Sequence, residues 1–330
     1  MSQRQTLSYL SKRLAEVGIK PKSKHGQNFL IDLNLLDIIA ATAKLEPTDI
    51  VLEVGTGTGS LTSIVAPQVA EVVTVEVDPQ MHQLASEELI DCENVTLHLG
   101  DALEGKHDID EEVLAILRAK LAVDPRRRLK LVANLPYNIA TPLIANLLAG
   151  SLVPATMTVT IQKELAERIC AAPSTKDYGA LSVWVQSQCT AEIVRIMAPT
   201  VFWPRPKVDS AILQITLDES RRNAIFDLDY FHRFARTLFM HRRKFLRSSL
   251  VASFKQALSK PEVDDVLERL GFGESSRAEE LSVEQILRLA EAFKLAQEQR
   301  GTMGVGGEIL VLDSADENDA GNDGDADVPS

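Results

Sequence analysis

The sequence predicts an α/β fold, in which a mixed sheet of about seven strands is followed by a small helical domain. Short apolar runs alternate with amphipathic segments up to about Leu217. This alternation indicates right-handed βαβ units and a largely parallel sheet. After Leu217 the strand signals stop and the apolar residues recur with helical spacing.

The expected strands are short runs rich in Val, Ile and Leu. They cover Ile50–Val54, Val72–Val77, Val95–Leu99, Leu129–Ala133, Ala155–Ile161, Ile193–Met197 and Ser210–Leu217. Amphipathic helices are expected before and between them. These cover Met1–Gly18, a segment capped by Asp32 that ends near Lys44, Leu61–Ala66, Pro79–Leu89 and Glu111–Leu121.

The C-terminal third has three helical segments and an acidic end. We expect helices over Tyr230–Ala257, Glu262–Leu270 and Val283–Gln299, the last capped by Ser282. From Gly301 onward Gly, Asp, Asn and Ala dominate, a composition typical of disorder. The predicted organisation is therefore an α/β domain with an N-terminal helix at 1–218, a helical domain at 219–300 and a disordered acidic tail at 301–330.

The composition indicates an ordinary globular chain. Hydrophobic residues make up 45%, yet no run of 18 apolar residues is present, so no membrane span is expected. The charged N-terminus is unlike a secretory signal. The three cysteines, Cys92, Cys170 and Cys189, match no metal-binding spacing. We expect a cytoplasmic, metal-free monomer.

The charge is unevenly distributed. The formal net charge is -12, which by itself disfavours nucleic acid as a partner. However, residues 1–27 hold six Lys and Arg against one acid, and residues 195–247 hold eleven against five. Seven acids lie in residues 313–330. An acidic chain with two locally basic stretches can still bind a phosphate backbone through them.

The segment Val51–Gly59 reads VLEVGTGTG, a strand that runs into three glycines. Glycines permit positive φ and let a ligand approach the backbone, and the following helix offers free N–H groups. This arrangement predicts a nucleotide-type site at the carboxyl end of the strand. The G-x-G-x-G spacing of Gly55, Gly57 and Gly59 fits S-adenosylmethionine better than a dinucleotide, which favours G-x-G-x-x-G. A glycine turn without a ligand is the alternative.

Acidic residues stand at the ends of three successive strands. Glu53 precedes the glycine loop and places negative charge where a cationic sulfonium or amino group would lie, whereas a pyrophosphate would be repelled. Glu76, 17 residues after Gly59, can accept both ribose hydroxyl hydrogens. Asp101 can accept a hydrogen from the adenine amino group of the cofactor. Asp78 is interpreted as a helix start before Pro79.

The fourth strand runs into Asn134-Leu135-Pro136-Tyr137. The N6 amine of adenine is a poor nucleophile because its lone pair is delocalised into the ring. The Asn134 side-chain oxygen and the Leu135 carbonyl can accept its two hydrogens and so favour a pyramidal nitrogen. Pro136 fixes the turn, and Tyr137 can stack on the base. The alternative is an ordinary turn after a strand.

With these motifs in order, the sequence resembles the KsgA-type small-subunit rRNA adenine N6,N6-dimethyltransferases and, more distantly, the Erm resistance methyltransferases. The resemblance covers about Lys22 to Leu250. Its motifs are KHGQNFL, LEVGTGTGSLT, VEVD, GDAL, NLPYNIATPL, QKELAERI, YGALSV, FWPRPKVDSAIL and FMHRRKFLRSSL. It implies a Rossmann-like class I methyltransferase sheet, and two adjacent adenines in the last hairpin loop of 16S rRNA as the target.

The resemblance also implies roles for individual residues. Gln27, Asn28 and Leu30 are expected to close over S-adenosylmethionine, and Asn134 is expected to join the cofactor to the target. Phe202 is expected to stack the flipped adenine opposite Tyr137. RNA phosphates are expected to bind basic residues in and before the helical domain, with a solvated basic face as the alternative. These are Lys207, Arg242, Arg243, Lys244 and Arg247.

Two features depart from the family pattern. Thr56 stands where the family loop has Pro, and Leu103–Pro125 is longer than expected. Three other functions remain open at this stage. They are a nicotinamide-dependent oxidoreductase, an Erm-like enzyme that acts on large-subunit rRNA, and a non-catalytic factor that binds pre-ribosomes.

Overall fold

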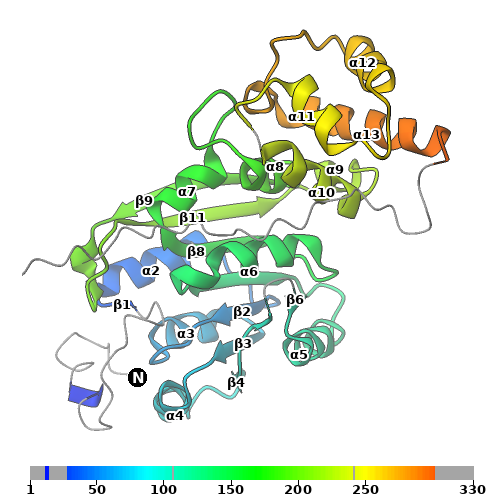
Figure 1. Cartoon of the computed structure of the whole chain (residues 1–330). Helices are drawn as coiled ribbons and strands as arrows, with labels where there is room; N and C mark the ends of the chain where they lie inside the picture. Colours follow the sequence, from blue (N-terminus) through cyan, green and yellow to red (C-terminus); the bar gives the residue numbers. More distant parts are fainter. Residues whose placement is uncertain (1–11, 15–27, 106–107, 241, 302–330) are drawn as a thin grey trace, which may run out of the picture. The chain divides into compact units, whose positions relative to one another are not determined.

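The computed structural model describes residues 12–14, 28–105, 108–240 and 242–301. The chain divides into two compact units. The α/β unit comprises Met1–Leu228 with Leu281–Glu284, and the helical unit comprises Asp229–Glu280 with Gln285–Ser330 (Figure 1). Within the described ranges, no helix has the length and apolar character needed to cross a membrane. Of the expected N-terminal helix only Lys12–Leu14 is described, and the tail beyond Gly301 lies outside the described residues.

A seven-stranded mixed sheet forms the centre of the α/β unit, as the sequence predicts (Figure 1). Its spatial order is β4-β3-β2-β7-β8-β11-β9. The first five of these are parallel, while β11 is antiparallel to both β8 and β9. The strands are β2 (Ile50–Val54), β3 (Glu71–Glu76), β4 (Val95–Leu99), β7 (Leu129–Asn134), β8 (Thr156–Gln162), β9 (Cys189–Met197) and β11 (Ser210–Leu217).

The edge strand β9 begins four residues earlier than the apolar run Ile193–Met197 indicates. Its first half contains the exposed polar residues Thr190 and Glu192, which hide the strand pattern. Pairing with β11 nevertheless extends to Cys189, opposite Leu217. The ladder with a neighbouring strand therefore sets the length of β9, and its own hydrophobicity does not.

Two short ladders were not anticipated. β1 (Phe29–Leu30) pairs antiparallel with β10 (Phe202–Trp203), although about 170 residues separate them. β5 (Leu103–Glu104) pairs with β6 (Asp108–Ile109). Each ladder joins only two pairs of residues, so neither gives a periodic signal in the sequence.

Helices connect the strands, and several of them begin where a side chain can satisfy free N–H groups. Asp32, Asp78 and Asp110 each cap a helix by accepting backbone hydrogens. The α-helices are α2 (Leu33–Thr42), α3 (Ser60–Val65), α4 (Pro79–Glu88), α5 (Glu111–Leu121), α6 (Tyr137–Ala149), α7 (Lys163–Cys170), α8 (Ala180–Gln186) and α9 (Glu219–Asn223). Two 3-10 turns, Ala66–Gln68 and Pro199–Val201, complete the α/β unit.

One face of the sheet packs against α2 and α3 through aliphatic side chains. Leu36 and Ile39 of α2 share a buried cluster with Val51, Val132 and Ile212 of three strands. The opposite end of the strands from the glycine loop holds a buried ion pair between Lys130 and Asp49, with Nζ and Oδ2 2.8 Å apart. This pair fixes the connection from α2 into β2.

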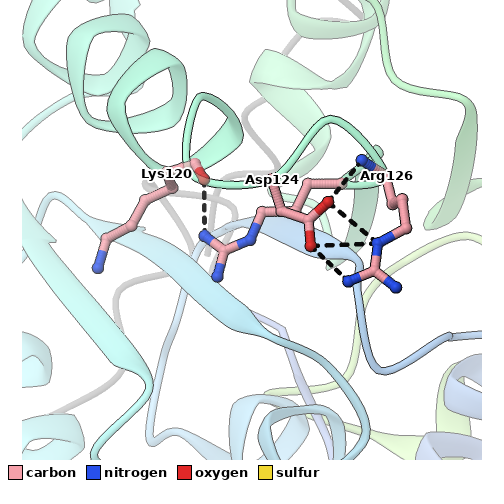
Figure 2. Close-up of polar contacts among 4 residues, drawn as sticks. Lys120, Asp124 and Arg126 are labelled. Carbon is pink, nitrogen blue, oxygen red and sulfur yellow. Dashed lines mark hydrogen bonds and ion pairs between the residues drawn. The ribbon is translucent and has the colours of Figure 1, made fainter.

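The turn after α5 is held by its own polar side chains (Figure 2). Asp124 accepts hydrogen bonds from the backbone and guanidinium of Arg126. The guanidinium of Arg127 donates to the carbonyl of Lys120 at 2.6 Å, near the end of α5. These contacts hold an ordered turn between α5 and β7.

The helical unit contains α11 (Leu246–Ser253), α12 (Lys260–Arg269), a 3-10 turn (Ala278–Glu280), and all but the first residues of α10 (Leu228–Phe239) and α13 (Val283–Gln299). Its core is aromatic, with rings of Tyr230, Phe234, Phe254 and Phe293 in mutual contact. The single helix predicted over Tyr230–Ala257 is wrong. The chain leaves the helix after Phe239 because a tertiary pairing between Phe245 and Arg277 replaces the helical hydrogen bonds.

Candidate functional site

A cavity of about 240 Å³ opens where β2, β3, β4 and β7 end, at the carboxyl edge of the sheet. This is the edge at which open α/β sheets bind ligands. Most of the residues predicted for the site line it together. These are Asn28, Leu30, Glu53, Gly55, Gly57, Glu76, Asp101, Asn134, Leu135, Pro136 and Tyr137.

The glycine loop adopts the left-handed conformation that its sequence predicts. Gly55, Gly57 and Gly59 have φ values of 84°, 58° and 77°. A Cβ atom on Gly57 would lie 3.1 Å from the ring of Phe29, and one on Gly55 would lie 3.2 Å from Pro136. The loop is thus packed between β1 and the tetrapeptide. Gly59 does not line the cavity, but it caps α3 where a Cβ would press on Leu89.

Glu53 lies at the base of the cavity and is only 2% exposed. Its Oε2 accepts hydrogen bonds from the hydroxyls of Thr62 at 2.5 Å and Thr74 at 2.7 Å. Burial raises the pKa of Glu53 to about 7, against the lowering effect of these two donors. A cation in the cavity would favour the ionised form, so the carboxyl is suited to bind positive charge.

The other two acids differ in environment. Glu76 is buried, and its two carboxylate oxygens accept from the backbone N–H groups of Gly57 at 2.8 Å and Asp78 at 2.9 Å. Burial raises its pKa. Asp101 is exposed at the cavity rim and accepts from the N–H of Leu103 at 3.0 Å. Asp78 caps α4, in agreement with its interpretation as a helix start.

The Asn134 side chain is oriented by the N-terminal segment. Its Nδ2 donates to the backbone carbonyl of Asn28 at 2.9 Å. Because the amide nitrogen is engaged there, the Oδ1 atom is left as the hydrogen-bond acceptor of this side chain. Leu135, next in the tetrapeptide, is held by a hydrogen bond from its N–H to the Thr160 carbonyl at 3.1 Å.

Tyr137 begins α6, and its side chain is hydrogen-bonded to strand β11. Its hydroxyl lies 2.6 Å from the Ser210 hydroxyl, at the start of β11. Burial raises the pKa of Tyr137, so its hydroxyl stays protonated over the working range of an enzyme. Ser210 was not among the predicted site residues, because a serine at the start of a strand carries no chemical signal by itself.

Phe202 is not brought into the cavity with the other residues. It is 3% exposed, pairs with Leu30 in the β1–β10 ladder and packs in the α2–α3 core cluster. Its stacking role therefore stays a prediction. Gln27 lies outside the described residues. The cavity also gains apolar walls that the sequence analysis missed, from Phe29, Met81 and Ile139. Their spacing matches ordinary core positions, which explains why no pattern singled them out.

The predicted RNA-binding residues are exposed or partly exposed. Lys207 lies on the surface of the α/β unit. In the helical unit, Arg247 forms a two-point ion pair with Asp264, and Arg242 lies 3.9 Å from Glu279. Arg243 and Lys244 are exposed and form no ion pair with any described residue.

Comparisons with known proteins show the family of this chain. A family model described as "Ribosomal RNA adenine dimethylase" matches residues 18–295. The chain is 38% identical over 280 residues to "Ribosomal RNA small subunit methyltransferase A" of Lactiplantibacillus plantarum, which covers 84% of this chain and 92% of that protein.

Two solved structures share the fold. A dimethyladenosine transferase from Plasmodium falciparum is 26% identical, with a TM-score of 0.67 over 80% of this chain and 97% of that one. The 23S rRNA methyltransferase ErmE is also 26% identical, with a TM-score of 0.57 over 81% of this chain and 100% of that one. The sheet is thus that of a class I methyltransferase, and the chain belongs to the ribosomal RNA adenine dimethylase family.

Proposed function

We propose that this chain transfers methyl groups from S-adenosylmethionine to N6 of two adjacent adenines in the 3′-terminal hairpin loop of small-subunit (16S) rRNA. It would act in the cytoplasm during biogenesis of the small subunit. The observation that carries the proposal is the position of Asn134. Its amide is fixed by the Asn28 carbonyl at the rim of a cavity that a glycine loop and three carboxyl groups surround.

The residues around the cavity fit S-adenosylmethionine. Positive φ at Gly55 and Gly57 keeps side chains out of the cradle. Glu76 would accept hydrogen bonds from the ribose hydroxyls and Asp101 would accept one from an adenine amine, while Glu53 would supply negative charge for the cationic end. When bound, the cofactor supplies a methyl group on a positively charged sulfur, which makes that methyl electrophilic.

The tetrapeptide prepares the target amine. Asn134 Oδ1 accepts one amine hydrogen and the Leu135 carbonyl accepts the other, so the nitrogen lone pair is directed away from the base plane. No strong base is required, because the methylated ammonium loses its proton readily. Holding the reacting groups in line supplies much of the rate. Tyr137 stacks on the base, with its ring held by the hydroxyl contact to Ser210.

We further propose that residues 219–300 act as a helical RNA-binding domain, with Arg243 and Lys244 as its phosphate contacts. Both are exposed and available, whereas Arg247 is engaged with Asp264. A phosphate must compete with a two-point ion pair for Arg247, so its contribution to RNA affinity is expected to be smaller.

Two alternatives are disfavoured by particular observations. A nicotinamide enzyme would place a pyrophosphate at the glycine loop, where the negative charge of Glu53 would repel it. Large-subunit rRNA is the substrate in the name of ErmE, but that protein is less similar to this chain than the small-subunit methyltransferase of L. plantarum.

The test uses small subunits that lack these methyl groups, labelled S-adenosylmethionine and the purified full chain. We expect label in N6,N6-dimethyladenosine of small-subunit RNA. Asn134→Ala should lower the methylation rate at least 100-fold, the scale of a catalytic hydrogen-bonding group. Asn223→Ala, an exposed control at the end of α9, should have normal activity. Label in large-subunit RNA would favour the Erm-like function. Binding of subunits and cofactor without transfer would instead favour an assembly factor.

A further inference from the structure

One aromatic ring of the helical unit is exposed to solvent. Phe245 is 48% exposed, and it is the one aromatic side chain in the described ranges that is classed as exposed. The other phenylalanines and the tyrosine at the centre of this unit are packed into its core. Leaving about half of a phenylalanine side chain in water gives up favourable apolar burial, so its position needs an explanation.

The backbone holds Phe245 in place rather than leaving it on a free loop. Phe245 forms an antiparallel bridge with Arg277, and the N–H of Leu246 donates to the Ser276 carbonyl at 2.7 Å. Leu246 itself is buried and begins α11. These contacts interrupt what the sequence would otherwise form as one long helix. The ring is thereby presented from a fixed backbone.

The guanidinium of Arg277 is a second planar group that lies beside the Phe245 ring. Its guanidinium carbon lies 5.5 Å from the centroid of Phe245, within the range of a cation–π contact. Arg277 is itself positioned by a hydrogen bond from its N–H to the Glu280 carboxylate at 3.0 Å. The guanidinium contacts the ring, while the large exposed fraction of Phe245 leaves much of the aromatic surface accessible.

The charges next to Phe245 select for an anionic partner. The two residues before it, Arg243 and Lys244, are exposed and without an ion-pair partner among the described residues. Acidic side chains nearby are already engaged, Glu279 with Arg242 and Asp264 with Arg247. An aromatic face beside two available cations is the combination that binds single-stranded nucleic acid, with the base on the ring and phosphates on the cations.

We propose that Phe245 and Arg277 form a stacking platform for an unpaired RNA base, with Arg243 and Lys244 binding the adjacent phosphates. This inference rests on the proposed RNA-binding function of the helical unit and adds a base contact to it. The platform is sequence-tolerant, because every base has a face that can stack. It lies apart in the chain from the tetrapeptide that binds the target adenine, and needs no contribution from it.

The test compares two probes of equal length and charge, a single-stranded decamer of uridine and a decamer of abasic ribose phosphates. Uridine has no exocyclic amine, so it avoids the adenine site. For the full chain we expect Phe245→Leu to weaken uridine binding about fivefold, at the low end for one stacked base, and to leave abasic binding unchanged. Phe245→Trp should retain or increase the affinity. Leu295→Ala, an exposed apolar residue of α13, is the matched control.

A second pair of variants separates this proposal from the one on which it rests. Arg243→Gln and Lys244→Gln should each lower the salt dependence of binding by about 0.7 in log–log slope, for both probes. If they do so while Phe245→Leu binds uridine normally, or weakens both probes equally, the platform is refuted and RNA binding stands. If all three variants bind normally, both the platform and the RNA-binding function of this unit are refuted. Thermal unfolding midpoints equal to wild type confirm that each variant is folded.

Discussion

Replacing Glu53 by Gln tests the electrostatic argument at the cofactor cavity. Burial holds the pKa of this carboxyl at about 7 in the folded protein, against an ordinary value of 4.5. The folded state therefore binds the proton more tightly than the unfolded state. By linkage, stability is lost as pH rises from 4.5 through 7, because the ionised group must be accommodated in the folded state. At 1.36 kcal/mol per pH unit, the full loss is about 3 kcal/mol.

The Gln variant removes this loss because it carries no charge at any pH. Its side-chain oxygen can still accept from the Thr62 and Thr74 hydroxyls. We expect the free energy of unfolding of the ligand-free variant minus that of wild type to be about 2.5 kcal/mol larger at pH 8.5 than at pH 5. Urea unfolding followed by tryptophan fluorescence measures it, since Trp184 and Trp203 are the only tryptophans and both lie in the α/β unit.

Cofactor binding should change in the opposite direction. Wild-type affinity for S-adenosylmethionine should rise as pH increases through about 7, because ionised Glu53 attracts its positive charge, whereas the variant should show little change. A stability difference that is the same at pH 5 and pH 8.5 would refute the raised pKa. If both proteins bind the cofactor with the same pH dependence, Glu53 does not contact the cationic part.

Three further perturbations test other parts of the structure. Tyr137→Phe and Ser210→Ala should each lower kcat/KM about fivefold, because each removes the same 2.6 Å hydrogen bond. The double variant should therefore lose no more activity than either single variant, and additive losses would contradict this. Gly57→Ala should weaken S-adenosylmethionine binding about tenfold in calorimetry, since a φ of 58° strains any other residue by about 1 kcal/mol or more. Unchanged affinity would exclude a role for the loop conformation in binding. Lys130→Met should cost about 3 kcal/mol in urea unfolding by leaving Asp49 buried and unpaired, and adding Asp49→Asn should recover most of it.

The location of the site could be predicted because it depends on local sequence and on one rule of topology. Glycines after β2, Glu76 at the end of β3 and Asn134 at the end of β7 each follow a recognisable apolar run. Parallel strands bring their carboxyl ends to one edge, so these residues meet without any knowledge of strand order. The sequence could therefore predict that these residues meet at one cavity, whereas their roles stay predictions.

Prediction failed where contacts between distant segments decide the conformation. The hydrogen bond from Asn134 to the Asn28 carbonyl and the β1–β10 ladder join residues more than 100 positions apart. The break between α10 and α11 depends on Arg277, about 30 residues further along the chain. No local periodicity reports such contacts, and the helical pattern across Tyr230–Ala257 is misleading because its apolar spacing suits two helices as well as one.

Thr56, in the middle of the glycine loop, has a structural role in this fold. The hydroxyl of Thr56 lies 2.6 Å from that of Thr74, and Thr74 donates its hydrogen to Glu53. Since a hydroxyl has one hydrogen, Thr56 must donate to Thr74 when Glu53 is ionised. A proline would fix the loop through its ring but could not donate. Thr56 instead ties the loop to β3 through a side-chain hydrogen bond, and the same bond supports the charged form of the carboxyl that faces the cofactor cavity.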